Sequence, residues 1–443
     1  MLRSLVGSEM CIRDSYISVR LPYSIIVYFS KKVKVFGLKM KICGVICEYN
    51  PFHNGHAHHL REAKRIAGNR PVIAAMSGSL VQRGLPALTD KWTRARMAVL
   101  GGVDLVLELP TVFTCRSAEF FAAGAVKLLA ATGMVSHLAF GAEAANSQQL
   151  MLTAEFLNEP VFQDALHHYL DEGHSYAKSL ELTLAEDPSM LTIAEHPNNI
   201  LALEYCRQLL HGGYEIEPVV VKRRGSGYKD KTINGPIAGA TAIREHYRGY
   251  GIDEALLSTV PATTAQLLRE ADLQHRMDIS DKILNHLLLY KLRSLTPAQI
   301  AAACQCSEGL ENRLAEAASC TTFQDVVSAT VTKRYPASRV RRLLMQLLLQ
   351  QYRAMFDNAK DPAYIRVLAF NDRGRELLKE MQDSAQLPVI IKLGRNVLEK
   401  YGEKVEQQLS VDIAATNLLT LLQKNHQPQY NNDYTVSPIY IQK

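Results

Sequence analysis

The sequence predicts an α/β protein with a parallel sheet in its first part and a mostly α-helical second part. Short, continuous apolar runs alternate with segments of helical spacing between residues 40 and 250, which is typical of a parallel sheet buried on both faces. Polar residues follow several of these runs, where the carboxyl ends of parallel strands bind ligands. Beyond residue 251 the chain is rich in Leu, Ala and Gln and has few strand signals. We therefore expect two domains, residues 40–250 and 251–443.

Local patterns place the individual elements. Apolar runs without helical spacing predict strands at residues 42–47, 71–76, 103–109, 137–140 and 218–221. Helical spacing predicts helices at residues 93–100, 117–130 and 198–210. In the second part, residues 389–392 give a strand signal, and we expect residues 364–368 and 437–441 to pack without a chemical role.

The most informative stretch is residues 44–56, which read GVICEYNPFHNGH. An apolar strand ends there in a turn, and a helix begins. His53 and His56 are three residues apart at the helix start and share one face, beside main-chain N–H groups and the positive end of the dipole. Gly55 leaves room for a base or ribose against the helix. Two histidines near a turn are more often surface or core residues, but the strand–turn–helix context favours a nucleotide site.

Two polar segments follow the second predicted strand. Residues 77–84 read SGSLVQRG, and Arg83 among them is suited to clamp an anion. Residues 90–96 open a predicted helix. A solvated loop followed by a helix capped by Asp90 explains these residues as well as substrate contact does.

Later candidates again fall at strand and helix ends. Gly141 ends a predicted strand where a nucleotide backbone can approach, and Arg223 follows the last predicted strand of the first part. Asn198 and Asn199 precede an apolar helix, so one of them either caps the helix or contacts an adenine or ribose; locally, capping is favoured.

A basic segment stands out in the second part. Residues 326–356 contain no acidic residue and six basic ones, Lys333, Arg334, Arg339, Arg341, Arg342 and Arg353. Such a run can neutralise phosphates, and Tyr335 and Tyr352 can stack on unpaired bases. The alternative is an amphipathic helix with a solvated basic face.

Composition sets wider bounds. The chain has 443 residues, 47% hydrophobic and 21% charged, with a formal net charge of +6 that permits an acidic partner. Eight cysteines form no C-x-x-C pair and suit a reducing cytoplasm, and no stretch is long and apolar enough to span a bilayer. We expect a soluble cytoplasmic protein. Residues 1–39 resemble in part a translated library adapter, so we expect a non-native leader and a start at Met40.

The motifs together resemble the HIGH-type nucleotidyltransferase superfamily. Residues 239–244, GATAIR, resemble its second motif, in which Thr241 and Arg244 are possible phosphate or substrate contacts together with Arg83. More narrowly, residues 48–56, 76–84, 90–92, 108–110, 140–141, 197–199 and 240–244 resemble those of the bacterial tRNA(Met) cytidine acetate ligase family, and the similarity extends from Met40 almost to the end.

This resemblance implies a Rossmann-like nucleotidyltransferase domain followed by a helical domain that contacts tRNA. It implies catalytic roles for His53 and His56 and a tRNA-binding cluster of Lys333, Arg334, Arg339, Arg341 and Arg342. By motif matching, the ATP-binding residues would be Ile46, Cys47, Glu48, Tyr49, Asn50, Pro51, Phe52, His53, Asn54, Gly55, His56, Ala57, His58, His59, Gly141, Asn198 or Asn199, and Arg223. The implied partners are ATP with Mg²⁺ and no protein ligands to the metal, acetate, and elongator tRNA(Met), with no membrane.

The expected reaction has two steps. Acetate attacks the α-phosphorus of ATP and releases pyrophosphate, and the acetyl-adenylate then acetylates the exocyclic amine of the wobble cytidine. A small-molecule adenylyltransferase would not need the basic second half, and a class I aminoacyl-tRNA synthetase would need a Lys-Met-Ser-Lys-Ser-like loop that the sequence lacks. A non-catalytic RNA-binding protein would not need His53, Gly55 and His56.

Overall fold

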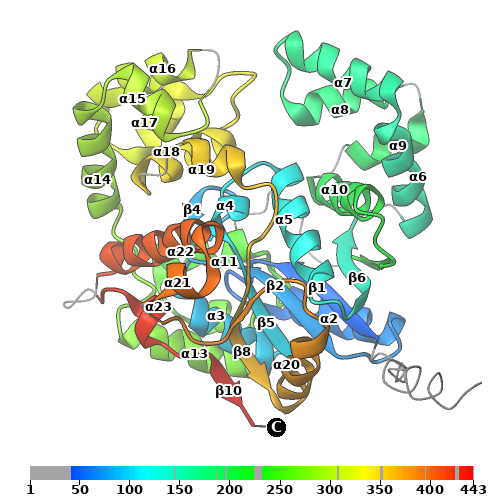
Figure 1. Cartoon of the computed structure of the whole chain (residues 1–443). Coiled ribbons are helices and arrows are strands. Elements are labelled where there is room, and N and C mark those ends of the chain that lie inside the picture. The colour runs from blue at the N-terminus through cyan, green and yellow to red at the C-terminus, as the bar shows by residue number, and fades with distance from the viewer. Residues whose placement is uncertain are drawn as a thin grey trace, which may run out of the picture. The chain divides into compact units, whose positions relative to one another are not determined.

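A mostly parallel sheet organises the chain, as the alternating pattern predicts (Figure 1). The computed structural model describes residues 41–143, 146–185, 187–194, 197–223, 232–306, 309–349, 353–394, 396–424 and 429–442. The predicted leader, residues 1–39, and Tyr352 lie outside these ranges. Lys41–Lys443 form one compact unit.

Eight strands of the described residues form this sheet, in the order β10-β8-β5-β2-β1-β6-β7 with β9 also paired to β8. Their bounds are β1 Ile42–Cys47, β2 Val72–Ser77, β5 Leu105–Leu109, β6 Val135–Ala142, β7 Glu217–Lys222, β8 Ile365–Asn371, β9 Val389–Ile390 and β10 Ile439–Ile441. The five strands predicted in the first part are all present and pair in parallel. A separate two-stranded hairpin, β3 (Leu80–Val81) and β4 (Leu85–Pro86), follows β2.

The sheet takes strands from both sides of the boundary predicted at residue 250. β8 pairs antiparallel with β5, placing Val106 opposite Ala369, and β9 and β10 pair in parallel with β8. We expected the segments that form β8 and β10 to be packing elements and missed that they are strands of the central sheet. β8 is buried along nearly its whole length and carries the charged Arg366, which interrupts the apolar pattern.

Helices cover both faces of the sheet. On one face a single core joins β1 and β2 to α2 (Asn54–Ile66), α3 (Lys91–Leu100), α11 (Ala240–Tyr250) and α13 (Ala262–Leu273). On the other face α5 (Ala118–Ala130) packs on β1 and β2, and α10 (Pro197–His211) packs on β6 and α5. This arrangement leaves the carboxyl end of β1 between the start of α2 and the starts of α5 and α10.

The remaining helices lie between and after these elements. Between β6 and α10 there are four helices that we did not predict: α6 Ser147–Asn158, α7 Pro160–Asp171, α8 Tyr176–Thr183 and α9 Pro188–Ala194. The second part is mostly helical, as predicted, with α12 Glu254–Leu257, α14 Asp281–Ser294, α15 Pro297–Ala303, α16 Leu310–Glu316, a 3₁₀ turn at Ala317–Ser319, α17 Phe323–Thr330, α18 Ala337–Leu348, α19 Arg353–Asn358, α20 Asp372–Ser384, α21 Val397–Tyr401, α22 Glu403–Leu422 and α23 Asn432–Thr435. A short helix, α4 (Thr111–Thr114), follows β5. Over the described residues, no helix has the length and apolar character needed to cross a membrane.

Candidate active site

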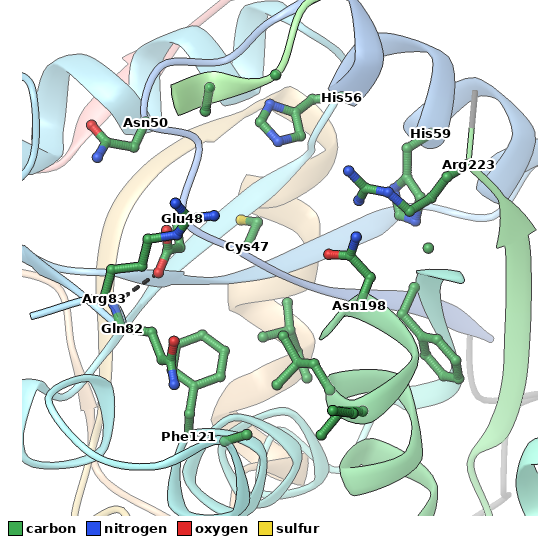
Figure 2. A pocket seen from close by; sticks show the side chains of 18 of the residues that line it. Cys47, Glu48, Asn50, His56, His59, Gln82, Arg83, Phe121, Asn198 and Arg223 are labelled. Carbon is green, nitrogen blue, oxygen red and sulfur yellow. Dashed lines mark hydrogen bonds between the residues drawn. The ribbon is translucent and has the colours of Figure 1, made fainter. Parts of the chain in front are cut away.

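A cavity of about 670 Å³ opens at the carboxyl end of β1. The strand is fully buried as far as Val45, but Ile46, Cys47 and Glu48 are half-buried because they form the cavity floor. Figure 2 shows the surrounding side chains, with Glu48, Gln82 and Arg83 on one side and Asn198, His59 and Arg223 on the other. Ligand binding at this edge is what a parallel sheet predicts.

Most of the predicted ATP-site residues line this cavity. Those that do are Ile46, Cys47, Glu48, Tyr49, Asn50, His53, Gly55, His56, His58, His59, Gly141, Asn198 and Arg223. Pro51, Phe52, Asn54, Ala57 and Asn199 are not among the lining residues. Phe52 is buried beside Tyr49, and the Asn54 amide donates to the carbonyl oxygens of Pro236 and Ser258, both at 2.9 Å, so these two side chains shape the turn from behind.

The two motif histidines lie against each other. Their ring centroids are 3.6 Å apart with the ring planes 23° from parallel, and the main-chain N–H of His53 donates to Nδ1 of His56 at 3.3 Å. In the neutral ring, this bond places the His56 proton on Nε2. His53 Nδ1 and His59 Nε2 are buried and have no hydrogen-bond partner among the residues that the structure describes. Polar atoms left without a protein partner at a cavity wall are suited to a ligand.

Three of the cavity histidines, His53, His56 and His59, are held in the neutral form. Burial, with the guanidinium groups of Arg223 and Arg244, lowers the pKa of His53 to about 3. Burial and the nearby His53 and His59 lower the pKa of His56 well below its usual value, and burial together with Arg223 lowers the pKa of His59 to about 4. The histidines therefore meet a ligand as neutral hydrogen-bonding groups, and positive charge comes from arginines.

The start of α2 differs from the sequence expectation in two respects. A Cβ at Gly55 would lie 2.9 Å from Cε1 of His53, so this glycine makes room for the His53 ring itself. The Asn54 N–H already donates to the Thr259 carbonyl at 2.9 Å, and the His56 N–H donates to the His53 carbonyl at 2.9 Å. Fewer main-chain donors are therefore available to a phosphate than the helix start alone predicts, because the preceding turn and a distant loop use them.

The three predicted phosphate contacts come together, although they are far apart in the sequence. Arg83 Nη1 donates to the Thr241 hydroxyl at 3.1 Å, and Arg244 Nη2 donates to the same hydroxyl at 3.3 Å. Arg244 Nη1 also donates to the Asn50 carbonyl at 2.7 Å, which ties the second motif to the turn of the first. Arg83 lines the cavity, whereas Thr241 and Arg244 lie behind its wall.

The structure distinguishes the two candidate asparagines. Asn198 lines the cavity, and its amide donates to Oε1 of Glu143 at 2.6 Å. Asn199 is fully buried, and its side-chain oxygen accepts from the Glu143 N–H at 2.8 Å. Asn198 is therefore the one placed to meet a ligand, while Asn199 fixes the loop after β6. Beside them, the stem of Arg223 lies over Gly141.

The polar residues 90–96 have structural roles. Asp90 caps α3 by accepting from the Thr93 N–H at 2.8 Å, as the structural alternative predicts. Arg94 is fully buried and donates to main-chain carbonyls at the ends of β1 and β2, including that of Glu48 at 2.7 Å and that of Ser77 at 3.2 Å. Arg94 thus holds the two strand ends at which the cavity opens.

The basic helix α18 reaches the same cavity. Pro336, Ser338 and Arg342 line it, and Arg342 Nη1 donates to the Gln82 carbonyl at 3.2 Å. Gly84, in the turn of the β3–β4 hairpin, has a φ of 69°, and a Cβ there would lie 2.4 Å from the Arg342 nitrogen. The hairpin and α18 therefore touch backbone to backbone, and only a glycine fits.

The predicted tRNA-binding cluster is not uniform. Lys333 is exposed and Arg334, Arg339 and Arg341 are half-buried, whereas Arg342 is engaged with the hairpin. Burial lowers the pKa of Arg341, and the positive charge of Arg83 lowers it further. The two like charges therefore lie close together. Stacking of bases on Tyr335 is not supported, because this ring is only 6% exposed and the Arg339 guanidinium lies 4.7 Å from its centre.

Several lining residues were not found from the sequence. Ser117 just before α5, Phe121 of α5, Tyr176 of α8 and Tyr205 of α10 line the cavity from segments that carry no motif. Only the position of Ser117 at a helix start gave a signal. Over the described part of the chain, no cluster of three or more His, Cys, Asp or Glu side chains could hold a metal ion.

Comparison with known proteins assigns this chain to a family. The HIGH Nucleotidyl Transferase family matches residues 40–433, so fold and site together define a HIGH-type nucleotidyltransferase. Two tRNA(Met) cytidine acetate ligases are each 38% identical: that of Thermoanaerobacter sp. (strain X514) over 87% of this chain and 96% of its own length, and that of Alkaliphilus metalliredigens (strain QYMF) over 90% and 99%. The chain belongs to the tRNA(Met) cytidine acetate ligase family.

Solved structures agree with this assignment. Thermotoga maritima TmcAL in its apo form is 33% identical, with a TM-score of 0.86 over 91% of this chain and 100% of that one. The same protein bound with alpha-thio ATP is 32% identical, with a TM-score of 0.84 over the same shares.

Proposed function

We propose that the protein uses ATP to activate acetate as acetyl-adenylate and transfers the acetyl group to the exocyclic amine of the wobble cytidine of elongator tRNA(Met), giving 4-acetylcytidine. One observation carries this proposal: a single cavity is lined both by the histidines of the nucleotidyltransferase motif and by Ser338 and Arg342 of helix α18, so the basic surface around this helix lies beside the adenylating site. Activation of acetate and contact with an acidic polymer can therefore take place at one opening. The names of the relatives supply the acyl donor and the acceptor.

The first step follows from the groups around the triphosphate. His53, His56 and His59 offer neutral imidazoles, and Arg223 offers positive charge. The acetate carboxylate attacks the α-phosphorus, and these groups stabilise the negative charge that moves to the leaving pyrophosphate. We expect Mg²⁺ to enter with the triphosphate, whose oxygens suit a hard cation.

The second step needs the tRNA near the same opening. We propose that the surface formed by Lys333, Arg334, Arg339 and Arg341 binds tRNA phosphates, while Arg342 fixes the hairpin that borders the cavity. The proposed division of labour is that residues 40–250 supply the adenylating site and residues 251–443 supply most of the tRNA contact.

The direct test is an assay with labelled acetate. The protein is incubated with ATP, Mg²⁺, labelled acetate and bulk bacterial tRNA, and the tRNA is digested to nucleosides. We expect label in 4-acetylcytidine, dependent on ATP and absent when tRNA(Met) is removed from the pool. Label in a small dinucleotide, or none in any nucleoside, would contradict the proposal.

A further inference from the structure

We propose that Glu48 accepts the proton from the exocyclic amine of the cytidine during acetyl transfer, an inference that rests on the function proposed above. Glu48 stands at the open end of β1, half-buried on the cavity floor. The reaction needs such a group because the amine must lose a proton as its nitrogen becomes an amide. The chain has carboxylates elsewhere, and the position of Glu48 in the cavity distinguishes it from them.

Two hydrogen bonds hold Glu48 in place. The main-chain N–H of Gln82 donates to Oε1 of Glu48 at 2.8 Å. Arg94 donates to the main-chain carbonyl of Glu48 at 2.7 Å. The first bond uses one carboxylate oxygen and leaves Oε2 to meet a substrate. A side chain fixed in this way can receive a proton at a defined position, which general base catalysis requires.

Glu48 also lies on the appropriate side of the cavity. In Figure 2 it stands with Gln82, Arg83 and Phe121, whereas Asn198, His59 and Arg223, which we expect to contact the nucleotide, lie across from it. Phe121 and Tyr205 also line the cavity, but their rings are only 2% and 4% exposed, so the position of Glu48 opposite the nucleotide carries the assignment. The acceptor base would thus enter beside the carboxylate.

The charge of Glu48 favours an amine as its partner. Phosphates and acetate carry only hydrogen-bond acceptors at neutral pH, so an ionised carboxylate repels them. The exocyclic amine of cytosine is a donor that carboxylates accept from. Of the cavity-lining residues that the structure describes, Glu119 is the other acidic one, and it is exposed in the first turn of α5.

The chemical step balances without a further reactant. The cytidine nitrogen forms a bond to the acetyl carbonyl carbon of acetyl-adenylate, and the bond between that carbon and the phosphate oxygen breaks. AMP leaves with the electron pair. The proton lost from nitrogen passes to Glu48 and then to water, so the products are acetylated cytidine, AMP and one proton.

The test compares the two half-reactions in Glu48→Gln. The amide keeps an oxygen that can accept from the Gln82 N–H but lacks a basic carboxylate. Adenylation is measured as acetate-dependent exchange of pyrophosphate into ATP, and transfer is measured in a single turnover from enzyme-bound acetyl-adenylate to tRNA. We expect transfer to fall by roughly a hundredfold, the usual scale for loss of a general base, and by about tenfold or more beyond any loss of adenylation.

Glu119→Gln is the matched control, because it removes the other acidic charge of the cavity. We expect it to transfer acetyl at close to the wild-type rate. Wild-type transfer by Glu48→Gln, an equal loss of both half-reactions, or an equal loss of transfer in Glu119→Gln would each overturn the assignment. Absence of tRNA acetylation in the wild type would instead refute the proposed function.

Discussion

At the residue scale, His56 is the side chain whose loss should be most specific. Replacing His56 by Ala removes a neutral hydrogen-bonding group from the cavity. The smaller side chain does not block the cavity, and no buried charge is left behind. We expect acetate-dependent pyrophosphate exchange to fall by roughly a hundredfold or more, as when one charge-stabilising donor is removed. The variant should remain folded, as thermal unfolding can show, although it loses the stacked ring and the acceptor of the His53 main-chain N–H. His168→Ala, on the exposed face of α7, is the control, and unchanged exchange in His56→Ala would leave the His53–His56 pair with a structural role only.

The pKa of His53 makes a second prediction, on stability. An unfolded histidine binds a proton near pH 6.5, but folded His53 does so only near pH 3, because burial disfavours the charged ring. Below about pH 6.5 the unfolded state therefore binds more protons, and the free energy of unfolding should fall as the pH falls, by about 2 kcal/mol at about pH 5 from this group. Urea unfolding without ATP should show a smaller loss in His53→Asn than in the wild type. Equal pH dependence in both proteins would mean that the ring is charged in the folded state.

At the scale of elements, the contact between the β3–β4 hairpin and α18 joins the two proposed functions. It depends on Gly84, whose positive φ and close approach to Arg342 exclude a side chain. Arg342 should therefore be left intact when tRNA binding is tested, because its loss would also disturb the Gln82 carbonyl at the cavity.

The surface of α18 and the turn before it gives the third prediction. Replacing Lys333, Arg339 and Arg341 by Ala removes positive charge but keeps the hairpin in place. We expect adenylation to be spared and tRNA transfer to fall strongly. A plot of the logarithm of the tRNA-binding constant against the logarithm of the salt concentration should become less steep. Its slope should shrink by roughly one unit or less for each phosphate that is no longer neutralised.

A matched triple variant, Arg373, Arg375 and Lys379 to Ala, removes the same charge from the exposed face of α20. It should bind tRNA with nearly wild-type affinity at equal salt. If both triple variants weaken binding alike, the effect is one of net charge, and α18 has no special role.

At the scale of the whole molecule, a buried ionic network joins the early strands to the end of the chain. Lys91 Nζ lies 2.7 Å from Oε1 of Glu108 and 2.6 Å from Oδ1 of Asp433, and Arg366 contacts the same two carboxylates. All four side chains are at most 4% exposed. The network thus connects α3, β5, β8 and α23.

Removing one member should destabilise the fold. Arg366→Met leaves two buried carboxylates with one cation, and we expect a loss of about 3–5 kcal/mol in the free energy of unfolding, the usual cost of breaking a buried ion pair on one side. Urea unfolding measures it. Arg375→Met, whose side chain is 65% exposed, should cost little. A loss of similar size in both variants would show that burial of the ionic network is not the cause of the lost stability.

The sequence alone determined the local part of this site. The order strand, turn and helix through residues 42–66, the closeness of His53 and His56, and the alternation that forms five parallel strands all depend on periodicity and short spacing. Tertiary structure decided what distant segments do. It placed β8 antiparallel beside β5, set Asn198 rather than Asn199 on the cavity, and covered the Tyr335 ring. It also brought Arg342 against the Gln82 carbonyl. These features arise where buried surfaces from opposite ends of the chain meet, and spacing along the sequence carries no information about which surfaces will pair.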